Sequence, residues 1–328
     1  MMQIVPTIDI SSISNDDIKA IKEACIDHGF FKIKGHGLNT LIDKMWQQAE
    51  TFFKASRPFK QSLRRPKDGA FGYFDSELTQ HKRDIKEVFD YAPKAVPLFD
   101  DSSKPYWPDN KNNQLVINGL NDFQGTLNQF YIAQTKLAQQ LMEILCQTLG
   151  EPPETLNKLF GDLQTSTARL NHYPSEDPIP ENERDNNIAL NDVALGAHTD
   201  PSAITLLLQD DIGGLQAYSA EHKWIDVTPE KYCFIINIGD IVQVWSNGRY
   251  KAAIHRVVKV PVGKARFSIP FFYMPQSEAV IKPIISGEKN KFREFLWSEY
   301  IKKRIADNYE KTGDKDMQVT DFMFKSRV

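Results

Sequence analysis

Cysteine is scarce in this sequence of 328 residues. The three cysteines, Cys25, Cys146 and Cys233, are odd in number and form no Cys-x-x-Cys motif, which argues against a disulfide framework. Cys25 and Cys146 fall on the apolar faces of helical patterns, so we expect buried, reduced thiols. Reduced thiols fit a cytoplasmic protein.

Long apolar runs and a large charge imbalance are absent as well. No apolar run approaches the length needed to span a bilayer, and residues 1–10 lack the basic and apolar regions of a signal peptide. The formal net charge of −3 gives no electrostatic reason to expect a nucleic acid or an anionic membrane as a partner. We therefore expect a cytoplasmic protein without a nucleic-acid or membrane partner, and the sequence leaves its oligomeric state open.

The first half of the chain, residues 1–165, mixes helical and strand patterns. Apolar spacing predicts a helix capped by Asn15 or Asp16 and a long helix over residues 123–149 that ends at Gly150. We expect the long helix to support a sheet. Short strands are predicted at residues 4–10 and 30–34.

From about Ser166 the pattern changes to short strands separated by turn residues. The predicted strands are Thr167–Tyr173, Ala203–Gln209, Leu215–Tyr218, Tyr232–Ile238, Ile241–Trp245, Ile254–Val260 and Arg266–Tyr273. Many short strands at regular spacing predict a mainly β sandwich, barrel or jelly roll. A final helix is predicted to hold Phe292, Phe295, Leu296, Tyr300 and Ile305.

No linker divides the chain, so we expect residues 1–328 to form one catalytic unit. Within it, residues 1–165 would be a helical and mixed region, residues 166–275 the β core with the site, and residues 276–328 a C-terminal helical region.

His198 and Asp200 stand two positions apart. Alternate residues of an extended strand point to one face, so both side chains can converge on one point. His255 follows 55 residues after Asp200, a gap that holds about five short strands, which in a two-sheet roll brings the chain back beside its start. Two imidazoles and one carboxylate on one side of a metal are typical of non-haem Fe(II) oxygenases.

Arg266 lies 11 residues beyond His255, one predicted hairpin further on, and shares a strand face with Ser268. We expect that face to point inward. An inward arginine needs an anion, and the guanidinium fork binds a carboxylate through two hydrogen bonds, to which a serine can add one. No nearby acidic residue has the strand parity to pair with it, so a ligand carboxylate is the expected partner.

In the strand predicted at 167–173, Asn171 and Tyr173 share one face. Tyr173 could donate its hydroxyl to the same carboxylate, and Asn171 could orient the ligand oxygens near the metal. For each of them a buried structural role is the alternative interpretation. Among the other histidines we interpret His28, His81 and His222 as surface residues and His36 as a turn residue.

These motifs resemble the signature of the 2-oxoglutarate- and Fe(II)-dependent dioxygenases. The resemblance is closer to the isopenicillin-N-synthase-like branch, which includes many plant biosynthetic oxygenases, and it covers nearly the whole chain. Further similar segments are Val5-Pro6-Thr7-Ile8-Asp9-Ile10, Gly29-Phe30-Phe31 to His36-Gly37, Asp84 to Phe89, Asn171-His172-Tyr173-Pro174, Thr205-Leu206-Leu207-Leu208-Gln209-Asp210 and Gly213-Gly214-Leu215-Gln216. The resemblance implies a double-stranded β-helix, or jelly roll, flanked by helices.

The resemblance also implies the reaction. Fe(II) would be held by His198, Asp200 and His255, and 2-oxoglutarate would be bound by Arg266, Ser268, Tyr173 and Asn171. Dioxygen and 2-oxoglutarate would be consumed, succinate and carbon dioxide released, and a small organic substrate hydroxylated, desaturated or cyclised. The branch accepts peptides, amino acids, flavonoid-like aromatics, terpenoid acids and nucleobases, and the motifs do not choose among them.

Two alternatives to this function stay open. Some members of the branch keep the Arg-x-Ser pair yet do not use 2-oxoglutarate, so Arg266 and Ser268 would bind the carboxylate of the substrate itself. The second alternative is a jelly-roll binding protein without catalysis. However, a complete metal triad (His198, Asp200 and His255) beside an intact carboxylate clamp (Arg266 and Ser268) is hard to explain without turnover.

Residues 62–116 are the least periodic part of the chain and are rich in glycine and proline. Long connections in a compact enzyme are often lids or binding loops. We therefore expect a substrate lid in this region, with Tyr73 and Phe74 in contact with the substrate.

Overall fold

The computed structural model of the chain describes residues 5–93, 120–309 and 317–324, apart from residues 67–68, 70, 80, 163 and 186. The lid predicted over residues 62–116 therefore lies partly outside the described residues. Its described part contains strands and one end of a helix, as set out below.

The α-helices of the described residues are α1 (Asn15–Asp27), α2 (Asn39–Lys54), α3 (Arg57–Ser62), α5 (Phe123–Leu149), α6 (Asp240–Trp245) and α7 (Trp297–Tyr309). The long helix α5 matches the prediction and ends at Gly150, whose φ of 85° is the left-handed conformation that glycine adopts without strain. The N-cap of α1 is Ser14, one residue earlier than predicted. Its hydroxyl accepts a hydrogen bond from the backbone of Asp17, whose carboxylate in turn accepts one from the backbone of Ser14.

Two sheets form the core. The larger has eight strands, in the order β1 (Thr7–Asp9), β2 (Phe30–Lys34), β12 (Phe234–Ile238), β9 (Ile204–Gln209), β14 (Ala265–Tyr273), β7 (Thr167–Pro174), β6 (Glu87–Tyr91) and β3 (Gly72–Phe74). The smaller has four, in the order β11 (Lys223–Asp226), β10 (Leu215–Ser219), β13 (His255–Val257) and β8 (Leu195–His198). Short pairs are formed by β4 (Leu78–Thr79) with β5 (Lys82–Arg83), and by β15 (Val280–Ile281) with β16 (Phe295–Leu296).

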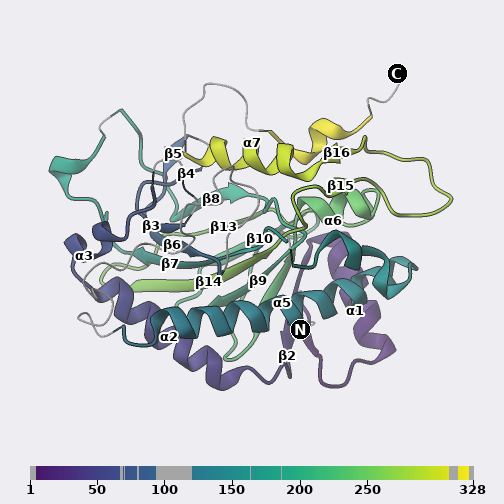
Figure 1. Cartoon of the computed structure of the whole chain (residues 1–328), viewed down its shortest axis with the longest axis horizontal. Helices are drawn as coiled ribbons and strands as arrows, with labels where there is room; N and C mark the ends of the chain where they lie inside the picture. Colours follow the sequence, from purple (N-terminus) through teal and green to yellow (C-terminus); the bar gives the residue numbers. More distant parts are fainter. Residues whose placement is uncertain are drawn as a thin grey trace.

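Helices α2 and α5 cover the large sheet from one side. Figure 1 shows α2 and α5 running side by side along that sheet, with α7 on the opposite side of the molecule. The apolar side chains of α2, α5 and the facing strands form the main hydrophobic core. The large sheet takes strands both from the N-terminal region and from residues 166–275, so the two regions share one core.

The prediction of a strand at Ile241–Trp245 is wrong, because these residues lie in the helix α6. A short apolar run that is buried on all sides carries no periodicity that separates a helix from a strand. The gap between Asp200 and His255 accordingly holds four strands and this helix, where about five strands were expected. The two short strands β8 and β11 were not predicted.

The connection after His255 also differs from the prediction. The strands β13 and β14 lie in different sheets, so Arg266 is not one hairpin beyond His255. The chain crosses from the small sheet to the large one between them. This crossing puts the predicted clamp on the wall opposite the two histidines.

The predicted C-terminal helix begins later than expected. Phe295 and Leu296 belong to β16, and α7 begins at Trp297. The surface prediction is wrong for His28, which is buried at the turn between α1 and β2. Its ring Nδ1 accepts a hydrogen bond there from the backbone of Phe30. The exposed position predicted for His222 is confirmed.

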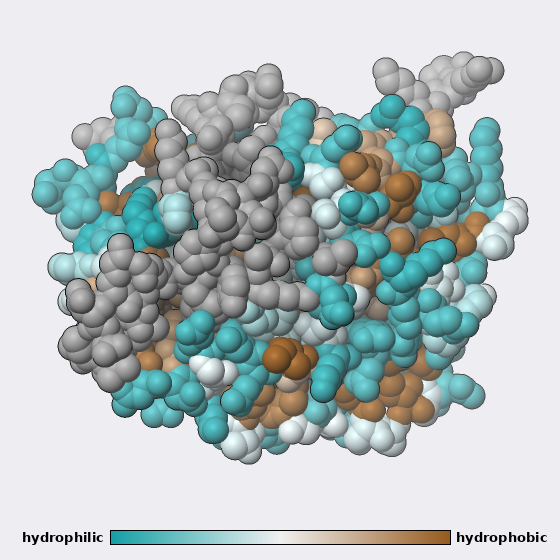
Figure 2. Space-filling view, viewed as in Figure 1, coloured by the Kyte–Doolittle hydropathy of each residue, from teal (hydrophilic) through white to brown (hydrophobic). Residues whose placement is uncertain are grey.

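The outer surface is ordinary for a protein of this composition. Figure 2 shows one face on which the described side chains are mostly hydrophilic, with apolar residues in small groups. Within the described part of the chain, no helix is both long and apolar enough to cross a bilayer. Cys25 and Cys146 are buried and free, as predicted, and Cys233 is buried and free as well.

Candidate active site

Three potential metal ligands meet between the two sheets. His198 is the last residue of β8, Asp200 follows in the turn before β9, and His255 opens β13. The two histidines are direct partners in the β8–β13 pair, with ring centroids 4.3 Å apart. Asp200 Oδ1 lies 3.5 Å from Nε2 of His198 and 3.7 Å from Nε2 of His255. The possible ligand atoms of the three residues all lie within 4.8 Å of one another.

The backbone holds both imidazoles in a fixed orientation. Nδ1 of His198 lies 2.8 Å from the carbonyl oxygen of Gly196, and Nδ1 of His255 lies 2.9 Å from that of Ala253. A carbonyl oxygen only accepts, so each Nδ1 carries the proton in these contacts. Each Nε2 is then left with a lone pair that faces Asp200.

The carboxylate of Asp200 is held by two donors on one of its oxygens. Thr205 donates its hydroxyl to Oδ2 at 2.6 Å, and Asn237 donates its side-chain amide to the same atom at 2.9 Å. Oδ1 is the oxygen that faces the imidazoles. The arrangement therefore offers one carboxylate oxygen, not two, to an ion between the three residues.

Electrostatics keep Asp200 and His255 deprotonated. Burial opposes the ionisation of Asp200, but the imidazoles of His255 and His198 and the hydrogen bond from Thr205 outweigh it, and the pKa of Asp200 lies below its ordinary value. Burial, reinforced by His198, lowers the pKa of His255 to about 4. At neutral pH the site presents an ionised carboxylate and a neutral His255, the states that a divalent cation requires.

The donor set fits Fe(II). Two imidazole nitrogens and one carboxylate oxygen on one side of an ion form the facial arrangement of non-haem Fe(II) sites, which leaves positions open for other ligands. The same three donors also suit other divalent ions, so the family comparison below decides the metal.

The predicted clamp is assembled on the facing sheet. Arg266 on β14 is only 1 % exposed, and its guanidinium donates to the carbonyl of Gly213 at 2.6 Å, to Ser268 Oγ at 3.1 Å and to Gln209 Oε1 at 3.2 Å. It also lies 4.9 Å from the ring centroid of Tyr173. Within the described chain Arg266 forms no ion pair, and burial lowers the pKa of its guanidinium.

Strand register brings the remaining predicted residues to the clamp. In the β14–β7 pair, Arg266 is opposite Tyr173 and Ser268 is opposite Asn171, and Asn171 donates to Ser268 Oγ at 3.3 Å. One cavity of about 350 Å³ is lined by these four residues and by the three metal-site residues. A ligand in this cavity can therefore contact the metal site and Arg266 together.

Comparison with known proteins decides the family. Residues 164–275 match the model of the 2OG-Fe(II) oxygenase superfamily, and residues 5–116 match the model of the N-terminal region of non-haem dioxygenases in morphine synthesis. Gibberellin 2-beta-dioxygenase 1 of Arabidopsis thaliana is 31 % identical over 93 % of this chain and 91 % of its own length. The chain belongs to the 2OG-Fe(II) oxygenase superfamily.

Two further relatives support the assignment. Homoarginine-6-hydroxylase 2-ODD-233 of Oryza sativa subsp. japonica is 29 % identical over 93 % of this chain and 95 % of its own length. The solved structure of JOX2 in complex with 2OG, Fe and JA matches with a TM-score of 0.76 and 25 % identity, covering 98 % of this chain and 89 % of that one. The protein is thus a 2-oxoglutarate- and Fe(II)-dependent dioxygenase with a jelly-roll core that acts on a small organic molecule.

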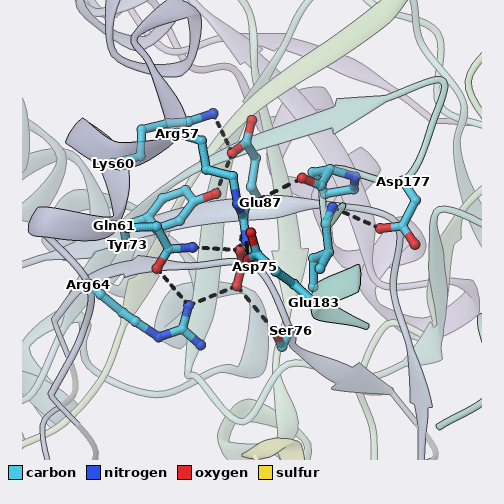
Figure 3. Close-up of polar contacts among 12 residues, drawn as sticks. Arg57, Lys60, Gln61, Arg64, Tyr73, Asp75, Ser76, Glu87, Asp177 and Glu183 are labelled. Carbon is cyan, nitrogen blue, oxygen red and sulfur yellow. Dashed lines mark hydrogen bonds and ion pairs between the residues drawn. The ribbon is translucent and has the colours of Figure 1, made fainter. Parts of the chain in front are cut away.

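The residues predicted to contact the substrate lie elsewhere in this oxygenase. Tyr73 is fully buried on the helix-covered face of the large sheet, where its hydroxyl donates to Glu87 at 2.7 Å. Figure 3 shows Tyr73 and Lys60 both pointing at Glu87. Phe74 lies beneath the guanidinium groups of Arg64 and Arg65. Neither Tyr73 nor Phe74 is among the residues that line the cavity.

Sequence reasoning missed three residues of the oxygenase site: Thr205, Asn237 and Arg304. Asn237 had a visible signal, since it is the one polar residue in the apolar strand Phe234–Ile238. A polar side chain buried in such a strand needs a partner. Arg304 on α7 had no such signal in the sequence, because its contact with the backbone oxygen of Thr199 at 3.0 Å joins segments far apart in the chain.

Proposed function

We propose that His198, Asp200 and His255 hold the Fe(II) of this oxygenase, and that Arg266 and Ser268 bind the distal carboxylate of 2-oxoglutarate. One observation carries the proposal: a buried arginine without an ion-pair partner in the described chain shares a cavity with three clustered metal ligands. A dicarboxylate that reaches from the ion to the guanidinium satisfies both ends.

Fe(II), when bound, supplies the redox chemistry that couples decarboxylation of 2-oxoglutarate to oxidation of a substrate C–H bond. The residues of the chain orient the reactants. Gln209 and the carbonyl of Gly213 fix the guanidinium of Arg266, so its remaining donors are set for a carboxylate. Tyr173 and Asn171 stand opposite the clamp strand, and we assign them to the same cosubstrate.

Apolar side chains exclude water around the cosubstrate position. Leu207, Leu215 and Val257 line the cavity between the two sheets, and each is at most 8 % exposed. A dry site strengthens the interaction of Arg266 with a carboxylate and limits side reactions.

We propose hydroxylation of a small organic molecule as the reaction outcome, with succinate and carbon dioxide as coproducts. The relative named homoarginine-6-hydroxylase supports hydroxylation over desaturation or ring closure. We further propose a cytoplasmic location, which the three free, buried cysteines support.

Succinate release tests the metal assignment. The purified enzyme, supplied with Fe(II) and 2-oxoglutarate, should release succinate slowly even without a primary substrate. This activity should be lost in His198→Ala, Asp200→Ala and His255→Ala. His222→Ala is the matched control, because His222 is exposed and lies outside the cavity. Retained turnover in any one triad variant would remove that residue from the site. Turnover of a substrate without 2-oxoglutarate would favour the alternative in which Arg266 binds the substrate's own carboxylate and dioxygen oxidises the substrate directly.

A further inference from the structure

The cavity continues beyond the cosubstrate clamp along the same two strands. Alternation along β7 places Arg169 and Thr167 on the face that carries Asn171, and alternation along β14 does the same for Phe272. The neighbouring strand β6 adds Asp90, which pairs with Arg169 in register. This part of the cavity is available to a substrate while 2-oxoglutarate occupies the clamp.

Four acidic and basic side chains form one wall of this part, and we call them the charged wall: Asp90, Arg169, Glu77 and Lys86. Arg169 donates two hydrogen bonds to Asp90, at 2.6 and 2.9 Å, and one to Glu77 Oε2 at 2.8 Å. Lys86 pairs with the same oxygen of Glu77. The four charges therefore alternate in sign along the wall, and all four residues line the cavity.

The wall is buried, and its environment favours the charged forms of Glu77 and Lys86. The side chains of Lys86, Glu77, Asp90 and Arg169 are 3 %, 6 %, 8 % and 13 % exposed. Burial opposes the ionisation of Glu77, but Arg169 and Lys86 outweigh it and lower the pKa of Glu77. Burial likewise disfavours the charged form of Lys86, but Glu77 and Asp84 outweigh it and raise the pKa of Lys86. Asp84 lies 3.6 Å from Lys86 and is fully buried.

Such a wall discriminates among ligands by charge. An apolar group placed against it would displace the remaining water and offer no hydrogen bonds to the charged side chains, which is unfavourable. A lone anion would be repelled by Glu77 and Asp90, and a lone cation by Lys86 and Arg169. A ligand that presents a donor and an acceptor side by side can pair with an acidic and a basic side chain of the wall at the same time.

Apolar side chains line much of the rest of the cavity, beside the polar Arg65, Arg304 and Gln318. Its lining includes Phe71, Leu78, Phe272, Met274 and Ile301. A substrate that fills both regions has one polar end and an apolar remainder.

We propose, on the basis of the function proposed above, that the charged wall binds the polar end of the primary substrate. This end carries a hydrogen-bond donor and an acceptor side by side, as in a zwitterionic amino acid or a cyclic amide. Glu77 and Lys86 are the residues that set this preference.

Ligand binding tests the assignment without turnover. Calorimetry under anaerobic conditions would use the enzyme loaded with Mn(II) and 2-oxoglutarate. The probes are amino acids, each paired with the acid lacking its amino group and the amine lacking its carboxylate, and pyrimidine bases, each paired with its N-methylated form. Terpenoid monocarboxylic acids complete the panel.

At least one donor–acceptor probe should bind about tenfold or more tightly than its partners, as loss of a charge-assisted hydrogen bond predicts. The amino-acid and pyrimidine arms separate the zwitterion from the cyclic amide. Glu77→Gln and Lys86→Met should abolish the preference and leave 2-oxoglutarate binding intact. Lys82→Met is the control, because Lys82 is exposed and lies outside the cavity lining.

The assignment is overturned if no donor–acceptor probe binds, if terpenoid acids bind equally well, or if the preference survives in both wall variants. The comparison of probes on the unmodified enzyme tests the assignment of the charged wall even where a wall variant does not fold. Failure of the proposed function would look different, because binding of Mn(II) and 2-oxoglutarate would then be absent before any probe is added.

Discussion

The hydrogen bonds to Asp200 predict how tightly the enzyme binds its metal. Thr205 and Asn237 both donate to Oδ2 and so direct Oδ1 toward the imidazoles. The isosteric change Thr205→Val removes one donor, and Asn237→Leu removes the other. A hydrogen bond to a charged group contributes about 1.5–3 kcal/mol, and the loss of such an orienting partner weakens metal binding by about 10–100-fold.

Calorimetric titration with Mn(II) or anaerobic Fe(II) measures this loss directly. Each single variant should raise the metal Kd by at least about tenfold, and the double variant should raise it further. Thr148→Val is the matched control, because Thr148 is also a buried threonine with hydrogen bonds but belongs to α5, away from the cavity. If both single variants fold and keep the Kd of the unmodified enzyme, the orienting role of these residues is refuted.

Three further predictions concern the clamp, the sheet and α7. Arg266→Leu should raise the half-saturating concentration of 2-oxoglutarate about 100-fold, and an unchanged value in succinate assays would remove Arg266 from the clamp. Glu87→Gln leaves the buried Lys60 unpaired, so the free energy of unfolding in urea at neutral pH should fall by about 3 kcal/mol; equal stability would contradict this. Arg304→Met removes the hydrogen bond to the backbone of Thr199 and should weaken metal binding, whereas an unchanged metal Kd would show that α7 does not position the ligands.

The Glu87 prediction depends on pH with a definite sign. Burial opposes the ionisation of Glu87, but His172, Lys60 and Tyr73 outweigh it and lower its pKa from the usual 4.5. A carboxyl whose folded pKa is lowered stabilises the protein above its unfolded pKa and loses this contribution as the pH falls through the folded value. The stability difference between the unmodified enzyme and Glu87→Gln should therefore shrink as the pH falls below about 4.5.

Local spacing was enough to predict which polar side chains meet in the cavity. His198, Asp200 and His255 are residue types that have few joint roles outside a metal site, and the separations along the chain allow them to meet. The face shared by Arg266 and Ser268 follows from strand alternation alone, as does that of Asn171 and Tyr173. For the same reason the long helix and most strands of the core were predicted within a few residues.

Features that depend on register or on distant partners were not predictable. Tyr73 and Asp90 belong to neighbouring strands, yet only the observed pairing shows that Tyr73 faces the helices and Asp90 the cavity. The helical run Ile241–Trp245 is short, mostly buried and apolar apart from Gln243, so its period is hidden. The sheet to which β14 belongs depends on a crossing that no local pattern encodes.

A diffraction map from crystals of the enzyme grown anaerobically with Mn(II) and 2-oxoglutarate would show the metal ligands and the cosubstrate contacts together. We expect one ion bound by Nε2 of His198, Nε2 of His255 and a single oxygen of Asp200, with the distal carboxylate of 2-oxoglutarate on Arg266 and Ser268. An ion held elsewhere, or a 2-oxoglutarate whose distal carboxylate does not contact Arg266, would contradict this expectation.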